Sequence, residues 1–130
     1  LDERIAAAVK VASAGFPLGF IIGPIFYYPE WEKEYGQMLE NLAQKLSGEI
    51  KAPPVFELIT HRFTERAKKN ILEVFPKTHL PLDEKERKFK FGQFGYGKYI
   101  YPKEKMAELK IFLEGKIQES FPKAEILYFV

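Results

Sequence analysis

Two short apolar runs constrain the fold more than any other feature of this sequence. Leu18–Ile25 reads L-G-F-I-I-G-P-I, without polar alternation, and Val55–Thr60 reads V-F-E-L-I-T. Runs of this length and composition are typical of parallel strands that are buried on both faces. A segment with helical periodicity precedes each run, at Leu1–Ala14 and at Glu30–Leu46. This alternation of helix and buried strand predicts an α/β fold.

The rest of the chain continues the alternation. A helix is predicted over Arg62–Phe75, with Thr64 as its N-cap and with Val74 among the residues that face inward. A further helix, Lys103–Ser120, and a terminal strand, Glu125–Val130, end the sequence. We expect the chain to divide into strand–helix units over residues 1–80 and a hairpin, helix and strand over residues 81–130, within one structural domain of 130 residues.

The stretch Arg87–Tyr101 has an unusual composition, R-K-F-K-F-G-Q-F-G-Y-G-K-Y-I-Y. Period-two alternation on both sides of residues 92–95 predicts a β-hairpin with a four-residue turn. In its first strand Lys88 and Lys90 share one face, and Phe89 lies on the other. One interpretation is a ribbon that contacts nucleic acid. The other is an amphipathic hairpin whose rings pack on the body of the protein while its lysines are solvated.

Two long segments carry a resemblance to a known family. They read R-F-T-E-R-A-K-K-N-I-L-E-V-F-P-K-T and L-D-E-K-E-R-K-F-K-F-G-Q-F-G-Y-G-K-Y-I-Y. They resemble the C-terminal part of spore photoproduct lyase, a family of radical S-adenosylmethionine enzymes that repair the thymine dimer of spore DNA. The likeness extends upstream through P-L-G-F-I-I-G-P-I and L-D-E-R-I-A-A-A-V-K. The resemblance implies the C-terminal portion of a partial (β/α)6 TIM-type radical SAM barrel, followed by a β-hairpin and a C-terminal helix and strand.

The sequence contains no cysteine. It therefore offers no thiolate for an iron–sulfur cluster and no thiol for catalysis. The resemblance implies S-adenosylmethionine and a 4Fe–4S cluster for the full-length enzyme, with the cluster cysteines in an earlier part of the family's chain. For this chain alone we expect no catalytic residue, no metal site, no bound cofactor and no activity. We also expect it to be a piece of a longer protein, with the N-terminal remainder of the same polypeptide as a partner.

Four residues are candidates for binding the cofactor. By resemblance, Ile22, Gly23 and Pro24 line the adenine of S-adenosylmethionine, where Gly23 would let a flat ring approach the backbone. The alternative is that Gly23-Pro24 only terminates a strand. His61 follows the second apolar run, where it would hydrogen-bond the cofactor or act as an acid or base. Its alternative is a structural or capping role.

The candidate DNA-binding residues form two groups. Arg62 and Arg66, one turn apart on the predicted helix, would clamp a phosphate, unless they pair with neighbouring glutamates. The second group lies in the hairpin and divides by chemistry into cations for phosphates, a tip that wedges into a base step, and rings that stack on an extruded thymine. Its members are Lys88, Lys90 and Lys98, then Gln93 and Phe94, then Tyr96 and Tyr99.

Composition adds only weak constraints on function. The net charge is +2, so a basic surface must be local, and no apolar run is long enough to span a membrane. The resemblance implies a cytoplasmic DNA-repair lyase whose substrate is duplex DNA containing the thymine dimer. This chain would supply part of the barrel wall and the DNA-contacting hairpin. The alternatives are a stand-alone, non-catalytic nucleic-acid-binding α/β module and an inert scaffold or partner-docking segment.

Overall fold

The computed structural model describes residues 1–92 and 95–130, and its centre is a three-stranded parallel sheet. The strand order is β1-β2-β5, with β1 (Gly19–Ile25) at one edge, β2 (Val55–Thr60) in the middle and β5 (Glu125–Phe129) at the other edge. The α/β class is therefore confirmed. Among the described residues, the helices are all too short or too polar to cross a membrane.

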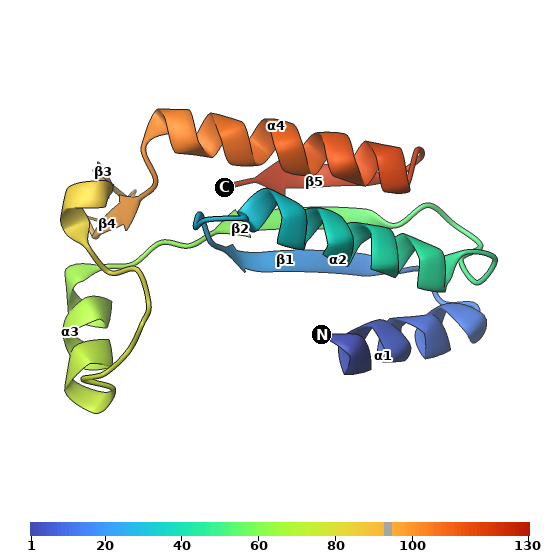
Figure 1. Cartoon of the computed structure of the whole chain (residues 1–130), viewed down its shortest axis with the longest axis horizontal. Helices are drawn as coiled ribbons and strands as arrows, with labels where there is room; N and C mark the ends of the chain where they lie inside the picture. The colour runs from blue at the N-terminus through green and yellow to red at the C-terminus, as the bar shows by residue number, and fades with distance from the viewer. Residues whose placement is uncertain (93–94) are drawn as a thin grey trace.

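Two long helices, α2 (Trp31–Leu46) and α4 (Lys103–Ser120), pack side by side on one face of this sheet (Figure 1). Their apolar stripes were readable from the sequence because residues three and four apart share a helix face. The side chains that meet at the centre of this core are fully buried or nearly so. They are Leu39, Leu42 and Leu46 from α2, Leu109, Leu113 and Ile117 from α4, and Phe56 and Leu58 from β2.

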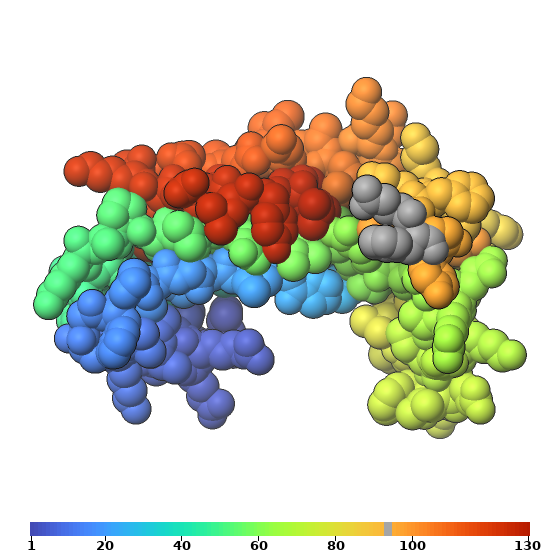
Figure 2. All heavy atoms as spheres, turned by 180° about the vertical axis from the view of Figure 1, so that it is seen from behind, coloured from blue at the N-terminus to red at the C-terminus, as the bar shows by residue number. Residues whose placement is uncertain are grey.

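On the opposite face of the sheet, no helix of the described residues packs. Burial alternates along β2, so that Phe56, Leu58 and Thr60 are buried while Glu57 and Ile59 on the other side are not. Ile21 of β1 is 68% exposed. Viewed from behind, the strand residues lie at the surface between α1 in blue and α3 in yellow-green (Figure 2). We call this surface, with Ile21, Glu57, Ile59 and Tyr128, the open face.

The open face corrects the prediction that both apolar runs are buried on two sides. The runs are apolar on both faces, but within this chain helices cover only one of them. Coverage depends on segments that pack from elsewhere, and the composition of a strand does not contain that information. Beside the sheet lies α1 (Asp2–Ser13), which packs on α2 and buries Ile5 and Ala12. The left-handed Gly15 follows its C-terminal end.

A second, two-stranded sheet forms the predicted hairpin. Its strands β3 (Lys88–Phe91) and β4 (Gly97–Ile100) are antiparallel, and Gly92 N donates to Tyr96 O at 2.8 Å. The connection spans residues 92–96, so it is one residue longer than the predicted turn. The tip residues Gln93 and Phe94 lie outside the described part of the structure. The hairpin itself is confirmed, and a short 3-10 helix, η1 (Glu84–Glu86), precedes it.

Helix α3 (Glu65–Val74) begins later than predicted. Thr64 is its N-cap, as expected, because its Oγ1 accepts from Ala67 N at 3.1 Å. Phe63 is held in extended backbone by pairing with Tyr99, and the helix therefore cannot start at Arg62. No residue of α3 is buried, and Val74 is 67% exposed. The predicted inward orientation of Val74 is therefore wrong.

Candidate functional site

Strands β1 and β2 end side by side, and this places the first candidate residues together. Ile25 pairs with Thr60, and His61 N donates to Ile25 O at 2.8 Å. The imidazole of His61 packs against Phe26 with ring centroids 4.7 Å apart, and His61 is only 8% exposed. The carboxyl ends of parallel strands are the edge where ligands bind in β/α folds. Gly23-Pro24 and His61 therefore lie at the edge that the sequence predicted.

Arg87 is a site residue that the sequence analysis missed. Its Nη1 donates to His61 O at 2.8 Å, and its Nη2 donates to Pro81 O at 3.1 Å. The same Nη2 lies 3.0 Å from His61 Nδ1, and the guanidinium carbon is 3.6 Å from the ring centroid of Tyr101. The available signal was its place at the start of the aromatic and basic stretch, which had been assigned to the hairpin alone.

This contact determines the protonation state of His61. A guanidinium donates hydrogen bonds and accepts none, so His61 Nδ1 must be the acceptor and carries no proton. Burial, followed by the positive charge of Arg87, lowers the pKa of His61 to about 4. At neutral pH the imidazole is therefore uncharged, and its one proton is on Nε2. In this state His61 is a hydrogen-bond donor.

The root of the hairpin is attached to the segment that follows β2. Tyr99 N donates to Phe63 O at 2.7 Å, and Phe63 N donates to Tyr99 O at 3.2 Å. The two rings are stacked, with centroids 5.3 Å apart, and the ring of Phe89 meets Tyr99 edge-on at 5.1 Å. Tyr99 OH donates to Glu65 Oε1 at 3.3 Å. Tyr99 thus anchors the hairpin, whereas Tyr96 is 77% exposed and offers an open ring.

The two faces of the hairpin differ from an ordinary surface ribbon. Lys90 lies directly opposite Lys98, an arrangement of like charges that destabilises a strand pair. Salt bridges between described residues lie elsewhere and do not include the hairpin lysines. The alternative interpretation required the rings to pack on the body of the protein. Phe91 is 76% exposed, so its ring does not do so. This pattern of cations and open rings suits a polyanion that also carries flat bases.

The predicted arginine clamp is wrong in its geometry. Arg62 precedes α3 in extended backbone, and Arg66 is exposed on the helix, so the two are not one helical turn apart. Arg62 Nε donates to Thr60 O at 3.5 Å, and its Nη2 is buried without a partner among the described atoms. Neither arginine belongs to a salt bridge of the described residues. Each remains a separate candidate for a phosphate contact.

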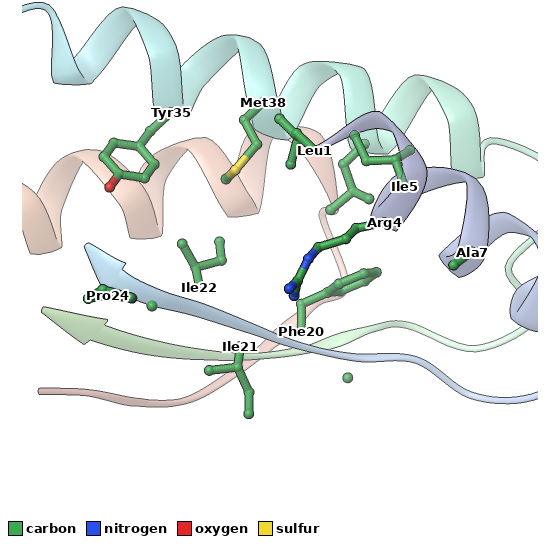
Figure 3. Close-up of a pocket in the computed structure, with 13 residues that line it drawn as sticks. Leu1, Arg4, Ile5, Ala7, Phe20, Ile21, Ile22, Pro24, Tyr35 and Met38 are labelled. Atoms are coloured by element: carbon green, nitrogen blue, oxygen red, sulfur yellow. The ribbon is translucent and has the colours of Figure 1, made fainter. Parts of the chain in front are cut away.

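Of the remaining cofactor candidates, Ile22 lies on the core side of β1. The side chain of Ile22 points toward α2 and packs on the core, while that of Ile21 points the other way (Figure 3). A Cβ on Gly23 would lie 3.1 Å from Ile59 Cβ, so a side chain there would crowd the neighbouring strand. Gly23 therefore has a packing role, and its role toward a ligand stays a prediction. The Gly23-Pro24 peptide is cis.

An apolar groove of about 640 Å³, which was not predicted, lies between α1, β1 and α2. Figure 3 shows the residues that line it. Phe20, Ile22, Met38 and Leu42 contribute to its walls. It follows the edge of β1 that has no neighbouring strand among the described residues. Such a surface suits apolar packing more than acid–base chemistry.

The donor set does not fit an iron–sulfur cluster. The sequence has no cysteine, and the described residues contain no group of three histidine, aspartate or glutamate side chains that could hold a metal ion. Iron–sulfur clusters are held by cysteine thiolates. Any such cluster would need ligands from outside these 130 residues.

Comparison with known proteins decides the family. The family model described as spore photoproduct lyase matches residues 1–130. The chain belongs to this family. Spore photoproduct lyase from Clostridium acetobutylicum is 48% identical over 130 residues, and that from Bacillus subtilis is 49% identical over 129 residues. These matches cover 100% and 99% of the chain but only 38% of each curated relative.

Solved structures of the family agree with the fold. Spore photoproduct lyase complexed with dinucleoside spore photoproduct superposes with a TM-score of 0.94 at 45% identity. A mutant spore photoproduct lyase with bound AdoMet and dinucleoside spore photoproduct also gives 0.94 at 45% identity. Each comparison covers 100% of this chain and 38% of the other.

Proposed function

We propose that this chain is the C-terminal part of a spore photoproduct lyase-like enzyme that repairs the thymine dimer lesion of spore DNA. In this enzyme the chain supplies barrel wall and a hairpin that contacts DNA. The observation that carries the second role is the cross-strand pair Lys90–Lys98 beside the exposed ring of Tyr96. A like-charged pair weakens the hairpin itself, but it strengthens binding to phosphates on either side of a base. The solved relative with dinucleoside spore photoproduct supports this class of substrate.

The barrel role rests on two parts of the sheet that the described residues do not cover, which are the open face and the edge of β1. Parallel strands with helices on one side and an apolar open face on the other suit one wall of a partial (β/α)6 barrel. The N-terminal remainder of the polypeptide would cover the open face and the edge of β1. The pairing of Phe63 with Tyr99 supports treating residues 1–80 and 81–130 as one domain.

The ligand-binding residues follow from the same arrangement. Gly23, Pro24, His61 and the backbone of Ile22, whose side chain packs on the core, would contact S-adenosylmethionine, which supplies the 5′-deoxyadenosyl group for radical chemistry when it is bound. Within this chain, Gly23-Pro24 lies near the carboxyl end of β1, and His61 offers one neutral donor beside it. The cluster ligands lie outside this chain, so the 130 residues alone would have no repair activity.

The DNA contacts would divide by chemistry. Lys88, Lys90 and Lys98 would neutralise phosphates, and Tyr96, whose ring is exposed, would stack on a base that has left the duplex. Tyr99, the other predicted stacking residue, instead holds the hairpin through Phe63 and Glu65. Gln93 and Phe94 at the tip would enter the base step. Arg62 and Arg66 would add separate phosphate contacts near α3.

A salt titration of duplex binding tests the hairpin role. Replacing Lys88, Lys90 and Lys98 together by Ala in the complete enzyme should weaken binding to damaged and undamaged duplex alike. The slope of log affinity against log salt should fall by about one unit per lost phosphate contact. The matched control replaces Lys33, Lys45 and Lys110, which are exposed on α2 and α4, by Ala. Equal affinities and slopes for the two triple variants would remove the hairpin from the interface.

A further inference from the structure

We propose that Arg87 is a positioning residue that fixes His61 as a neutral donor, and that His61 Nε2–H binds an acceptor atom of a nucleobase at the carboxyl end of β2. The inference rests on the proposed function, because it assigns a nucleobase ligand to that site. It gives His61 a single role, as a donor, and it gives Arg87 a role that no phosphate contact would explain.

The contacts of Arg87 are already used within the protein. Its guanidinium donates to the carbonyl oxygens of His61 and Pro81 and to His61 Nδ1, and it stacks on Tyr101. Three of its five N–H donors are used in these contacts. These contacts orient the imidazole, because turning the ring over would place a C–H group where Nδ1 now accepts. Arg87 therefore selects both the tautomer and the orientation of His61.

The opposite edge of the imidazole carries Nε2, which forms no hydrogen bond with the described residues. Among the described side chains, the one nitrogen or oxygen that is fully buried without a partner is Arg62 Nη2. His61 Nε2 has no hydrogen-bond partner among the described residues, and it is not one of their fully buried, unpartnered polar atoms, so this edge of the largely buried ring is available to a ligand. The Nε2–H donor of an imidazole that is held in place at Nδ1 is therefore suited to bind a ligand.

The surroundings indicate the chemistry of that ligand. Phe26 and Phe63 flank His61, with centroid distances of 4.7 and 5.9 Å. A neutral donor between aromatic walls suits a flat, uncharged group with a ring nitrogen or carbonyl acceptor. Phosphate and carboxylate groups are bound more strongly by charged donors, and this imidazole is uncharged. A nucleobase meets these requirements, whether it is the adenine of S-adenosylmethionine or a thymine of the lesion.

The position of Arg87 also links this donor to the hairpin. Arg87 directly precedes β3, and Tyr101, on which it stacks, directly follows β4. The hairpin therefore begins directly after Arg87, which orients His61, and ends directly before Tyr101, on which Arg87 stacks. Movement of the hairpin root is coupled by these contacts to the position of Nε2.

A pair of isosteric variants tests the donor in the complete enzyme. In His61→Gln, the side-chain nitrogen can take the place of Nε2, whereas His61→Asn can replace only Nδ1. Calorimetric titration with S-adenosylmethionine alone and with dinucleoside spore photoproduct alone separates the two sources of base. We expect His61→Asn to weaken one of the ligands roughly tenfold, as for one lost hydrogen bond, and His61→Gln to retain most of the affinity. The exposed His79, replaced by Asn and by Gln, is the control.

A spectroscopic measurement tests Arg87 without depending on a His61 variant. Nitrogen-15 spectra of labelled histidine should show His61 with its proton on Nε2 and with Nδ1 as a hydrogen-bond acceptor. Arg87→Met should remove the acceptor signature at Nδ1, and Arg87→Lys, which retains a donor, should restore part of it. A proton on Nδ1 in the unaltered protein would overturn the inference. Equal ligand affinities for the His61→Asn variant and the unaltered enzyme would also overturn it.

The two sets of experiments fail separately. If His61→Asn binds both ligands normally while the lysine variants flatten the salt slope, this inference is wrong and the proposed function stands. If the unaltered complete enzyme binds neither ligand, the proposed function is wrong and the nucleobase assignment is overturned with it.

Discussion

The imidazole of His61 lies against the ring of Phe26, with their centroids 4.7 Å apart and their planes tilted by 30°. A protonated imidazole in this position would be poorly solvated and would face the guanidinium of Arg87. The folded protein therefore disfavours the charged form, and the pKa of His61 falls to about 4 from its usual 6.5.

Stability should decrease in mildly acidic solution for this reason. Between pH 6.5 and pH 4 the unfolded chain binds a proton at His61 and the folded chain does not, so the free energy of unfolding falls as the pH falls. The contribution of His61 is complete above pH 6.5, and its loss amounts to on the order of 3 kcal/mol by pH 4. Urea denaturation across this range should show a pH dependence that His61→Gln reduces and His79→Gln retains. Parallel curves for the unaltered chain and His61→Gln would contradict this account.

Gly97 allows the ring of Phe89 to cross β4. A Cβ at position 97 would lie 1.8 Å from Phe89 Cζ, so Gly97→Ala should push the ring away from Tyr99. Losing this aromatic pair should cost about 1 kcal/mol. The loss should be visible as faster hydrogen exchange at the Tyr99 amide. In a Phe89→Ala background, Gly97→Ala should have little further effect.

A matched glycine substitution is the control for that experiment. Gly115 lies within α4, and a Cβ there would meet no other atom within 4 Å. Gly115→Ala should therefore stabilise the protein by about 0.5–1 kcal/mol, since alanine favours a helix over glycine. Destabilisation by both substitutions to the same extent would refute the specific role of Gly97.

The pair Lys90–Lys98 should show opposite effects on folding and on binding. Lys90→Glu replaces a like-charged cross-strand pair by an opposite one, and we expect the hairpin to gain about 0.2–1 kcal/mol. The same change should weaken duplex binding in the complete enzyme, because one phosphate contact becomes repulsive. Thermal unfolding and fluorescence anisotropy measure the two effects. Lys110→Glu, beside Glu114 on α4, should leave duplex binding unchanged.

Local patterns in the sequence predicted most elements correctly. The bounds of β2, the cap at Thr64 and the bounds of α4 follow from neighbouring residues, so sequence spacing contains them. The start of α3 does not, because it depends on the pairing of Phe63 with the distant Tyr99.

The same limit applies to the candidate site. His61 was recognised from its place after a strand, but Arg87 comes within reach of it only through folding, across 26 residues of sequence. The hairpin was predicted from alternation alone. The register that places Lys90 against Lys98 depends on the length of the connection, which the turn prediction set one residue too short.

The open face should make the isolated chain associate with itself. Ile21 is 68% exposed on the open face and offers an apolar contact. Its strand, β1, is at the edge of the sheet, where the backbone can pair with a strand of another copy. Sedimentation velocity at several concentrations should show association, and Ile21→Asp should reduce it. Ile111, which is 74% exposed on α4, is a matched residue away from the sheet. A monomer at all concentrations, or an equal effect of Ile111→Asp, would show that the open face does not drive association.

The pairing of Phe63 with Tyr99 attaches the hairpin to the segment that directly follows the central strand β2. Phe63 lies only three residues beyond Thr60, the last residue of β2, and β2 is hydrogen-bonded to a strand on each side. A load on the hairpin from a bending duplex would therefore pass along the backbone into the best-supported strand of the sheet. A hairpin joined to the protein only through a surface loop would instead move together with its bound ligand. Anchored in this way, the hairpin would keep its position in the protein if a bound duplex bent around it.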